Sequence, residues 1–570
     1  MSSNHQMKHI NWSVKIGLLL LIHLALSCHQ TKDTNDKVIV VHARGITYPD
    51  MVNHLNSIKS DGFFKRKEAS GSIKKLHPIT NAVTICNMAS YETGSMPSEH
   101  GIIGHLFGLK EDNSLRVVSG FAQRFATETF WEKADIQGEK VLNVGALTIH
   151  GKYENHTNVD CLAQGSQIGS PQILQVIPDK EHQSHPIIKY KNLEGKDKLQ
   201  LQQYPDALLV YQINQADRNN ELILDDDYNY SNGFFAKIKS GTWSEIDHAK
   251  DHNIKQAFRV KWIPSSKDTL SLYIRASYAN RGYPDKFVEQ IDRGIGPSRG
   301  WPNIPFYTSK NISDTTLIEE MNAEVDYVMN AFSFAAQKKE YDLIMIDYPL
   351  IDRLGHAFLG LRDSSIAVQK HYEAAFNRMN KDFERIEDFA QRNGYDLIIT
   401  SGHGFSPIHT SIDINTFLNK NGIHTNHKET GWEAIGVPGK VSAHIYVNDQ
   451  LNPNDKAAVL SKIERAFKTL YGPVVKTPVV DDIYRKNELK DINLFHHNAG
   501  DLYILLNPGF VFENNGDEGD HIFGTPTFMG DHGYSLKHED SFGILISNAP
   551  CEPCHSTDIS KIIEEQLKLD

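Results

Sequence analysis

Tyr341-Asp-Leu-Ile-Met-Ile-Asp347 and Tyr395-Asp-Leu-Ile-Ile-Thr-Ser401 open with the same residues and share one apolar pattern. Short, nearly continuous apolar runs of this kind are typical of strands buried inside a parallel sheet. Between them, residues 363–393 are charged and periodic, which predicts a long amphipathic helix. A strand, a helix and a second strand at this spacing predict a right-handed crossover unit, and therefore an α/β fold around a mostly parallel sheet.

The rest of the chain supplies more strands for this sheet and two stretches that interrupt it. We expect further core strands at residues 37–43, 140–146, 501–506 and 542–547. Residues 166–335 are rich in Tyr, Asp, Asn and Lys and contain short alternating runs such as 269–275, which predicts an inserted α+β cap. Residues 425–495 combine an alternating run with a helical pattern, which predicts a smaller α+β insertion. The core is therefore expected at residues 37–165 and 336–550, with a C-terminal tail at 551–570.

The N-terminus has the features of an export signal. Lys8 and Lys15 precede an apolar run at residues 16–26, which is too short to cross a bilayer, since a spanning helix needs about 20 residues. The sequence Ala25-Leu-Ser-Cys28 resembles a bacterial lipobox, which implies removal of residues 1–27, lipidation of Cys28 and a flexible tether at 28–36. Ordinary signal cleavage with Cys28 incidental is the alternative. The lipobox predicts a lipoprotein at the periplasmic or cell surface whose contact with membrane is the lipid alone.

Charge and cysteine content exclude some classes of function. Loss of residues 1–27 removes two lysines and no acidic residue, so the formal charge of −12 becomes −14. This balance argues against nucleic-acid duplexes and anionic membrane surfaces as partners. Cys86 and Cys161 are isolated in sequence, so the chain is not built on a disulfide framework. Nothing in the sequence sets the oligomeric state.

The tail contains Cys551-Glu-Pro-Cys554-His555, a spacing that can attach a c-type haem in an exported protein. Few residues follow it and no cytochrome-like helical pattern surrounds it. We therefore favour a local disulfide or free thiols over haem attachment.

Polar side chains gather where the predicted strands end, which is where open parallel sheets bind ligands. Asp352 and His356 follow the strand at 341–347, His403 follows the strand at 395–401, and His532 lies in Gly530-Asp-His-Gly-Tyr534 near the C-terminus. A lone histidine beside a glycine is more often a turn or a buried structural residue. Four such residues after predicted strands instead predict nitrogen and oxygen ligands converging on zinc.

An earlier segment completes the pattern. Pro78-Ile-Thr-Asn-Ala-Val-Thr84-Ile-Cys-Asn87 is followed by Thr93-Gly-Ser-Met-Pro97 and His100-Gly-Ile102. The order of all these pieces resembles the type I phosphodiesterase/nucleotide pyrophosphatase branch of the alkaline phosphatase superfamily. The resemblance spans about residues 37–550 without the cap. It implies an alkaline-phosphatase-like three-layer sandwich and hydrolysis of phosphodiester or pyrophosphate bonds.

The resemblance also implies roles for individual residues. Thr84 falls on the nucleophile and Asn87 on the residue that helps to hold a phosphoryl oxygen. Asp352, His356 and His532 fall on one complete zinc site. His403 falls on the histidine of a second zinc site.

This chain departs from the family at that second site. Arg44 stands where the first strand should end in a ligating Asp, and Gly402 stands where Asp should precede His403. Without both carboxylates the second site should hold no zinc, because one histidine and a hydroxyl bind it poorly and a guanidinium repels it. One zinc is therefore expected, although Asp347, Asp531 or His409 would be the residues to supply new ligands for a second.

Two functions follow from this site. The first is an exported hydrolase of small-molecule phosphate esters with one zinc, in which Arg44 replaces the second ion and binds phosphoryl oxygens while His403 deprotonates Thr84. The alternative is a non-catalytic relative that binds an anionic phosphate- or sulfate-bearing ligand in the same cleft. The cap is expected to roof this cleft. Its tryptophans Trp243, Trp262 and Trp301 could stack on a base or sugar, but we favour a role as buried core aromatics.

Overall fold

The computed structural model describes residues 36–58, 61–111, 114–147, 156–168, 170–178, 187–192, 209–213, 221–225, 236–247, 257–266, 269–426, 431–474, 476–514 and 521–569. The expected export signal, Cys28 and all but the last residue of the expected tether lie outside these residues. Within them, no helix combines the length and the apolar character needed to cross a membrane.

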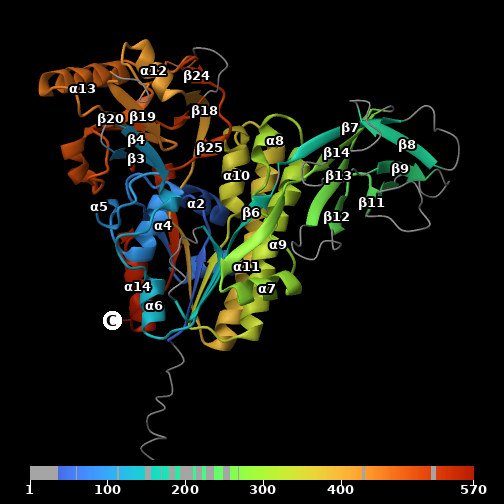
Figure 1. Cartoon of the computed structure of the whole chain (residues 1–570). Helices are drawn as coiled ribbons and strands as arrows, with labels where there is room; N and C mark the ends of the chain where they lie inside the picture. The colour runs from blue at the N-terminus through green and yellow to red at the C-terminus, as the bar shows by residue number, and fades with distance from the viewer. Residues whose placement is uncertain are drawn as a thin grey trace, which may run out of the picture.

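The core of the molecule is a nine-stranded sheet in an α/β arrangement (Figure 1). Its spatial order is β15 (Ser277–Tyr283), β6 (Val159–Ile168), β5 (Val141–Ala146), β16 (Leu343–Asp347), β1 (Val38–His42), β17 (Asp396–Ser401), β26 (Gly543–Ile546), β2 (Ile73–His77) and β27 (Cys554–His555). The five strands from β6 to β17 are mutually parallel, which confirms the predicted fold class. β16 and β17 are not neighbours, because β1 lies between them and pairs with both.

Helices cover both faces of this sheet and make three layers (Figure 1). Residues alternate between the two cores along β1, with Ile39 and Val41 on one face and Val38 and Val40 on the other. The first face is covered by α2 (Tyr48–Ser57), α3 (Phe63–Ala69), α9 (Asp314–Lys338), α10 (Leu350–Phe358) and α11 (Ile366–Asn393). The second is covered by α4 (Thr84–Thr93), α6 (Phe130–Ile136) and α14 (Asp558–Leu567). The sheet is therefore buried on both sides, as its apolar strands predict.

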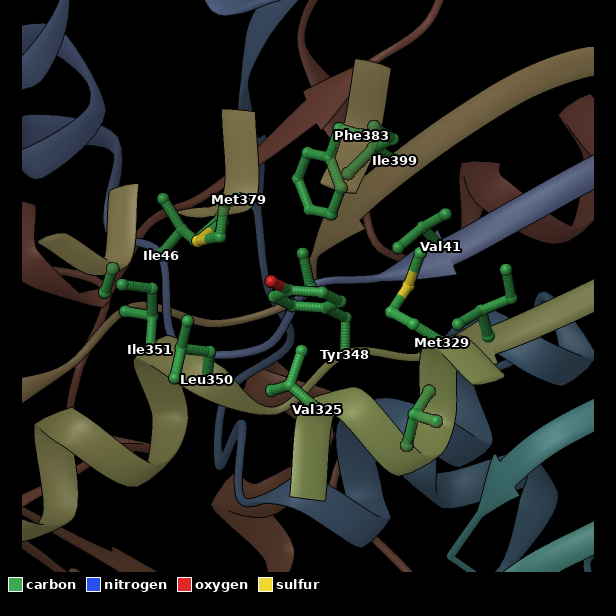
Figure 2. Packing of buried hydrophobic residues seen from close by; sticks show 14 of the residues in the cluster. Val41, Ile46, Val325, Met329, Tyr348, Leu350, Ile351, Met379, Phe383 and Ile399 are labelled. Carbon is green, nitrogen blue, oxygen red and sulfur yellow. The ribbon is translucent and has the colours of Figure 1, made fainter. Parts of the chain in front are cut away.

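Tyr348, the first residue after β16, anchors the polar loop to this core. Figure 2 shows its ring among Val325 and Met329 of α9 and Met379 and Phe383 of α11. Its hydroxyl donates to the buried carboxylate of Asp382 at 2.8 Å, and its backbone N–H donates to the carbonyl of His42 at 2.9 Å. The chain leaving β16 is thereby held beside the end of β1.

The inserted cap is smaller than the sequence predicts. An eight-stranded antiparallel sheet projects from one side of the core (Figure 1) and consists of β11 (Ala236–Lys239), β10 (Glu221–Asp225), β9 (Leu209–Ile213), β8 (Ile187–Asn192), β7 (Gln172–Pro178), β14 (Thr269–Ile274), β13 (Ala257–Ser266) and β12 (Trp243–Asp247). The expected boundary at residue 335 is wrong, because β15 rejoins the main sheet and α9 packs on its face. Two further helices, α7 (Asp285–Gly294) and α8 (Ile304–Thr308), lie between them in sequence.

The smaller insertion is larger than expected. Its main sheet runs β19 (Ala434–Pro438), β20 (Ser442–Val447), β22 (Leu502–Leu506) and β21 (Val480–Arg485), beside α12 (Ile414–Lys420) and α13 (Pro453–Lys468). The assignment of residues 501–506 to the core sheet is therefore wrong. β22 lies between two apolar clusters, with Leu502 in one and Tyr503 in the other, so its continuous apolar run mimics a central strand of the core.

Short elements connect these parts. A second small sheet contains β23 (Gly509–Phe512), β18 (Ser406–Ile412), β24 (Phe523–Gly524) and β25 (Gly530–Asp531), and a hairpin pairs β3 (Leu106–Glu111) with β4 (Ser114–Ser119). The remaining helical turns are α5 (Pro97–His100), η1 (Gly120–Ala122), η5 (Leu359–Leu361), η6 (Lys486–Ile492) and η7 (Glu539–Ser541).

Candidate active site

The carboxyl ends of β1, β16 and β17 bring the predicted site residues to one edge of the sheet. His42 of β1 is in register with Asp347 of β16 and Thr400 of β17. The turn after β1 passes close to α10, because Gly45 has φ +85° and a Cβ there would lie 2.7 Å from the backbone nitrogen of Asp352. Only glycine combines this backbone conformation with this approach.

Asp352, His356 and His532 form a compact, fully buried cluster. Asp352 and His356 lie one turn apart on α10, while His532 follows β25. Oδ1 of Asp352 lies 3.9 Å from Nε2 of His356 and 4.0 Å from Nε2 of His532. Each residue offers one ligand atom within 4.8 Å of the others. Among the residues that the structure describes, these three form the group that could hold a metal ion.

Backbone carbonyls orient both histidines. Nδ1 of His356 lies 2.9 Å from the carbonyl of Gly530, and Nδ1 of His532 lies 2.9 Å from the carbonyl of Ala82. Because a carbonyl only accepts, each Nδ1 carries the proton and each Nε2 presents a lone pair. These lone pairs face Oδ1 of Asp352, a buried atom without a hydrogen-bond partner. A cluster of acceptors with fixed outer contacts fits a bound zinc ion.

Burial and neighbouring charges keep His532 and Asp352 in the protonation states that bind metal. Burial lowers the pKa of His532 to about 3 against the opposing effect of Asp352, so its ring is neutral at pH 7. Burial opposes the charged form of Asp352, but Arg44 and Arg353 outweigh it and hold the pKa of this carboxyl well below its usual range.

Thr84 stands beside this cluster at the first position of α4. Its Oγ1 lies 3.3 Å from Nε2 of His532. No side chain caps the start of α4, where Val83 is the N-cap. The first N–H groups of the helix and its positive dipole end therefore favour an anion next to the Thr84 hydroxyl.

Asn87 lies one turn further along α4 and is fully buried. Its Oδ1 accepts a hydrogen bond from Oγ of Ser556 at 3.0 Å, which fixes the orientation of the amide. Its Nδ2 has no hydrogen-bond partner. The sequence did not point to Ser556, although it follows directly after the Cys-x-x-Cys-His motif. Cys551 and Cys554 form a disulfide, so neither is available for haem attachment.

Arg44 lies where the resemblance places a ligand of the second metal site. Its Nε and Nη2 donate to the two oxygens of Asp347 at 2.8 and 2.9 Å, and its Nη1 donates to Oδ2 of Asp352 at 3.1 Å. The side chain is 1% exposed. Burial acts against its charge, but the carboxylates of Asp347 and Asp352 outweigh burial and raise its pKa. A permanent cation therefore lies beside the cluster of Asp352, His356 and His532. The N–H groups of its guanidinium already donate to carboxylates of the protein.

Gly402 leaves no room for the carboxylate that the family carries there. A Cβ added at Gly402 would overlap Nδ2 of Asn87, and it would lie 3.7 Å from Nε2 of His42. The amide of Asn87 thus occupies the space of the missing side chain. A side chain at residue 402 would therefore have to displace this amide.

His403 joins the two positions. Its ring stacks on that of His532 with centroids 3.6 Å apart and an interplanar angle of 7°. Nδ1 lies 3.0 Å from the carbonyl of Gly404, whereas the buried Nε2 has no hydrogen-bond partner. Burial and the neighbouring His532 hold the pKa of His403 well below its ordinary value. The hydroxyl of Thr84 hydrogen-bonds with His532 and not with His403.

The three residues considered as new ligands do not complete a second site. Asp347 is bound by Arg44, and Nδ1 of His409 lies 2.8 Å from the hydroxyl of Thr410. Asp531 leaves Oδ2 without a hydrogen-bond partner, 3.9 Å from Nζ of Lys440. None of the three belongs to the metal-binding group formed by the described residues.

A cavity of about 340 Å³ opens onto the cluster. Its lining includes Thr84, Arg44, Lys440 and Trp301, and the other residues that line it are Val83, His105, Phe121, Leu147, Gln164, His356, Phe528, Asp531 and His532. Lys440 adopts φ +81°, a strained conformation for a residue with a side chain. Burial and Lys440 lower the pKa of His105 to about 4.

Of the three tryptophans considered for substrate stacking, Trp301 lines this cavity. Trp243 instead donates to Glu319 of α9 at 2.7 Å, where the inserted sheet meets the core. Trp262 lies on β13 and does not line the cavity. Of the three, Trp301 is the residue whose position allows stacking on a ligand in this cavity.

Comparison with known proteins identifies the relatives of this chain. The family model described as type I phosphodiesterase/nucleotide pyrophosphatase matches residues 48–535. A search of curated protein sequences finds no significant match.

Similar solved structures cover nearly the whole chain at low identity. Phosphonoacetate hydrolase from Sinorhizobium meliloti 1021, in complex with phosphonoformate, is 13% identical with a TM-score of 0.50 and coverage of 93% of this chain and 95% of that one. Human ectonucleotide pyrophosphatase/phosphodiesterase 5 is 11% identical with a TM-score of 0.47 and coverage of 94% and 95%. At 13% identity, the likeness to the hydrolase concerns the fold alone.

Proposed function

Because this chain belongs to the type I phosphodiesterase/nucleotide pyrophosphatase family, a family of phosphate-ester hydrolases, we propose that it hydrolyses phosphodiester or pyrophosphate bonds with Thr84 as nucleophile. One zinc ion would be held by Asp352, His356 and His532. The observation that carries this proposal is the buried set of acceptors around the unpartnered Oδ1 of Asp352, beside the Thr84 hydroxyl.

The proposed reaction has two steps. Oγ1 of Thr84 attacks phosphorus, the bond between phosphorus and the leaving oxygen breaks, and a threonyl phosphate forms while the alcohol or phosphate departs with a proton. Water then attacks the same phosphorus and restores the Thr84 hydroxyl. Bound zinc would supply Lewis-acid polarisation of a phosphoryl oxygen. Nε2 of His403 accepts the proton of Thr84, which is supported by its neutral state and its lack of another partner.

Fixed positive groups of the protein take the place of a second ion. Arg44 lines the cavity and keeps its charge while its fork holds Asp347 and Asp352, so it stabilises the phosphoryl group as a nearby cation. Nδ2 of Asn87 and the N–H groups at the start of α4 are further donors to the phosphoryl oxygens. Lys440 adds a second positive charge to the same cavity.

The test compares Thr84→Ala with Thr84→Ser in zinc-loaded protein. Release of p-nitrophenol from bis(p-nitrophenyl) phosphate should fall by at least about 1,000-fold in the alanine variant, because no nucleophile remains, and should survive in part in the serine variant. Thr315→Ala, an exposed threonine in the first turn of α9, is the matched control and should have no effect. Equal turnover by Thr84→Ala and the unaltered protein would exclude the mechanism.

The second candidate is a non-catalytic protein that binds an anionic ligand. It is favoured by one observation, the filling of the second metal position by Arg44 and Asn87. Calorimetric binding of a phosphodiester without turnover, at every zinc concentration tried, would support it and would reject the hydrolase.

Export and lipid attachment are part of the same proposal. They rest on the basic start, the apolar run and the lipobox-like residues before Cys28. Expression of the full chain in bacteria with radioactive palmitate should label it at Cys28, and Cys28→Ser should abolish the label. An unlabelled but cleaved chain would mean ordinary secretion.

A further inference from the structure

A second compartment adjoins the active-site cavity and has no role in the chemistry proposed above. It measures about 290 Å³, and it shares Trp301 and Phe528 with the 340 Å³ cavity. The other residues that line it are Gln167, Pro171, Arg275, Ala276, Tyr278, Pro302, Asn303, Ile304 and Pro305. Because both cavities share two walls, a ligand held at Thr84 can extend into the second compartment past Trp301.

Trp301 is held rigidly although its side chain is 37% exposed. Its Nε1 donates to Oε1 of Gln164 at 2.6 Å, and the guanidinium of Arg353 lies 3.5 Å from its ring centroid. Arg353 in turn donates to Asp352 at 2.8 Å and pairs with Glu324. The shared wall is thus supported by the same ionic cluster that positions a zinc ligand. An exposed aromatic ring fixed at this point has the character of a binding platform rather than a loose surface residue.

The two compartments differ in charge. The cavity at Thr84 contains the cations Arg44 and Lys440. In the second compartment the one charged residue is Arg275, which is 2% exposed and lies 3.4 Å from Glu320. Its Nη2 donates to the carbonyls of Gly300 and Trp301 at 3.2 and 3.0 Å. The walls are otherwise aromatic, apolar or amide-bearing, and the charge of Arg275 is already balanced by Glu320, so a second charged group would lose water there without gaining an unpaired counter-charge.

We propose that the cleft is bipartite and that the substrate is a phosphodiester of a sugar, with the phosphoryl group at Thr84 and the uncharged sugar ring against Trp301 in the second compartment. A pyranose has apolar C–H faces that pack on flat aromatic walls such as Trp301 and Tyr278. Its hydroxyls match the side-chain amides of Gln167 and Asn303. Mostly apolar walls with a few orienting polar groups are the usual composition of a small-molecule site.

This inference rests on the proposed hydrolase, and the test separates the two. Methyl p-nitrophenyl phosphate and glucos-6-yl p-nitrophenyl phosphate release the same phenolate and differ only in the second alcohol. The glucosyl ester should have a kcat/KM on the order of 10-fold higher, as expected for one extra packed and hydrogen-bonded ring.

Gln167→Trp fills the exposed mouth of the second compartment. The ratio of the two kcat/KM values should fall toward one in this variant. Gln391→Trp places the same bulky residue on the exposed surface of α11, at a position that lines neither cavity. It should leave the ratio of the two kcat/KM values unchanged. A ratio near one in the unaltered protein, or a ratio that Gln167→Trp leaves unchanged, would overturn the bipartite cleft.

If neither ester is hydrolysed, a measurement of binding affinity tests the bipartite cleft instead. Calorimetry on the Thr84→Ala protein should then show tighter binding of the glucosyl ester than of the methyl ester, with the difference lost in the added presence of Gln167→Trp. Equal affinities would reject the sugar compartment, whatever the activity of the site.

Discussion

Two metal positions are implied by the family at the same edge of the sheet, and this chain treats them in opposite ways. The first keeps Asp352, His356 and His532, with lone pairs turned inward by backbone contacts. The second holds the Arg44 guanidinium, and the Asn87 amide occupies the space of a carboxylate at residue 402. The two positions therefore differ in chemistry, with metal-type acceptors at the first and a guanidinium and an amide at the second.

One carboxylate serves both positions. Oδ2 of Asp352 accepts hydrogen bonds from Arg44 and Arg353 at 3.1 and 2.8 Å, while Oδ1 faces the histidines without a partner. The built-in cation therefore fixes the ligand that the first position uses. Disturbing one position should therefore affect the other through this residue and through the stacked rings of His403 and His532.

The largest effect is expected on zinc binding, when a ligand of the first metal position is removed and the second position is left unchanged. His356→Ala removes a ligand and should weaken zinc binding by more than about 100-fold, since even the loss of outer-shell partners costs 10–100-fold. His403→Ala, the matched histidine of the second position, should keep about one zinc per chain. Elemental mass spectrometry of both purified variants measures this, and zinc lost from His403→Ala instead would reverse the assignment.

Removal of the built-in cation should cost stability. Arg44→Ala leaves Asp347 buried without its guanidinium partner and removes one of the two arginines that bind Asp352, and breaking a buried pair in this way costs about 3–5 kcal/mol. Arg66, whose ion pairs with Glu384 and Glu387 lie at the surface, is the control, and Arg66→Ala should cost less than about 1 kcal/mol. Urea unfolding of metal-free protein gives both values, and equal costs would mean that Arg44 is not held as described.

Restoring the family carboxylate should not restore the second ion. Gly402→Asp forces its Cβ against Asn87 and should destabilise the protein by about 1–3 kcal/mol, as overpacking does. Bound zinc should stay near one per chain, because Arg44 remains in place. Two zinc ions in this single variant would show that the second position is vacant rather than filled.

The smallest expected effect is on the free energy of unfolding, and it is confined to acidic pH. His532 and His403 stack, and burial lowers the pKa of both rings, to about 3 for His532; the neighbouring His532 lowers the pKa of His403 further. The unfolded chain binds their protons at ordinary pKa values near 6.5, so their contribution to stability is complete above pH 6.5 and is lost as pH falls toward 3. In metal-free protein, His403→Phe should flatten the decline in urea stability between these values. An unchanged slope would place the titration elsewhere.

The sequence was sufficient for much of the fold and for the metal cluster. The core strands at residues 37–43, 140–146, 341–347 and 395–401 were predicted because apolar runs ending in polar residues mark parallel strands. The carboxyl ends of parallel strands lie together, which was enough to place Asp352 and His356 beside the end of β17. His532 follows β25, which pairs antiparallel with β18 in a separate sheet, so this argument alone does not bring it to them.

What the sequence could not supply are contacts that depend on packing. β22 carries the same apolar run as a core strand, and only its two apolar neighbours place it in the smaller sheet. The ion pair between Arg44 and Asp347 depends on the register of β1 against β16 and not on a sequence motif. The hydroxyl of Ser556 donates to Asn87 from the other end of the chain, and no local sequence pattern predicts this contact.

That last contact bears on when, during synthesis, the protein acquires its site. Thr84 is separated from His532 by 448 residues and Asn87 from Ser556 by 469, so the earliest and the latest parts of the polypeptide meet there. A nascent chain carries the hydroxyl long before the histidine that contacts it or the serine that orients the amide. Chains cut short before residue 532 therefore lack both contacts, and the site is assembled only after this late segment has been made.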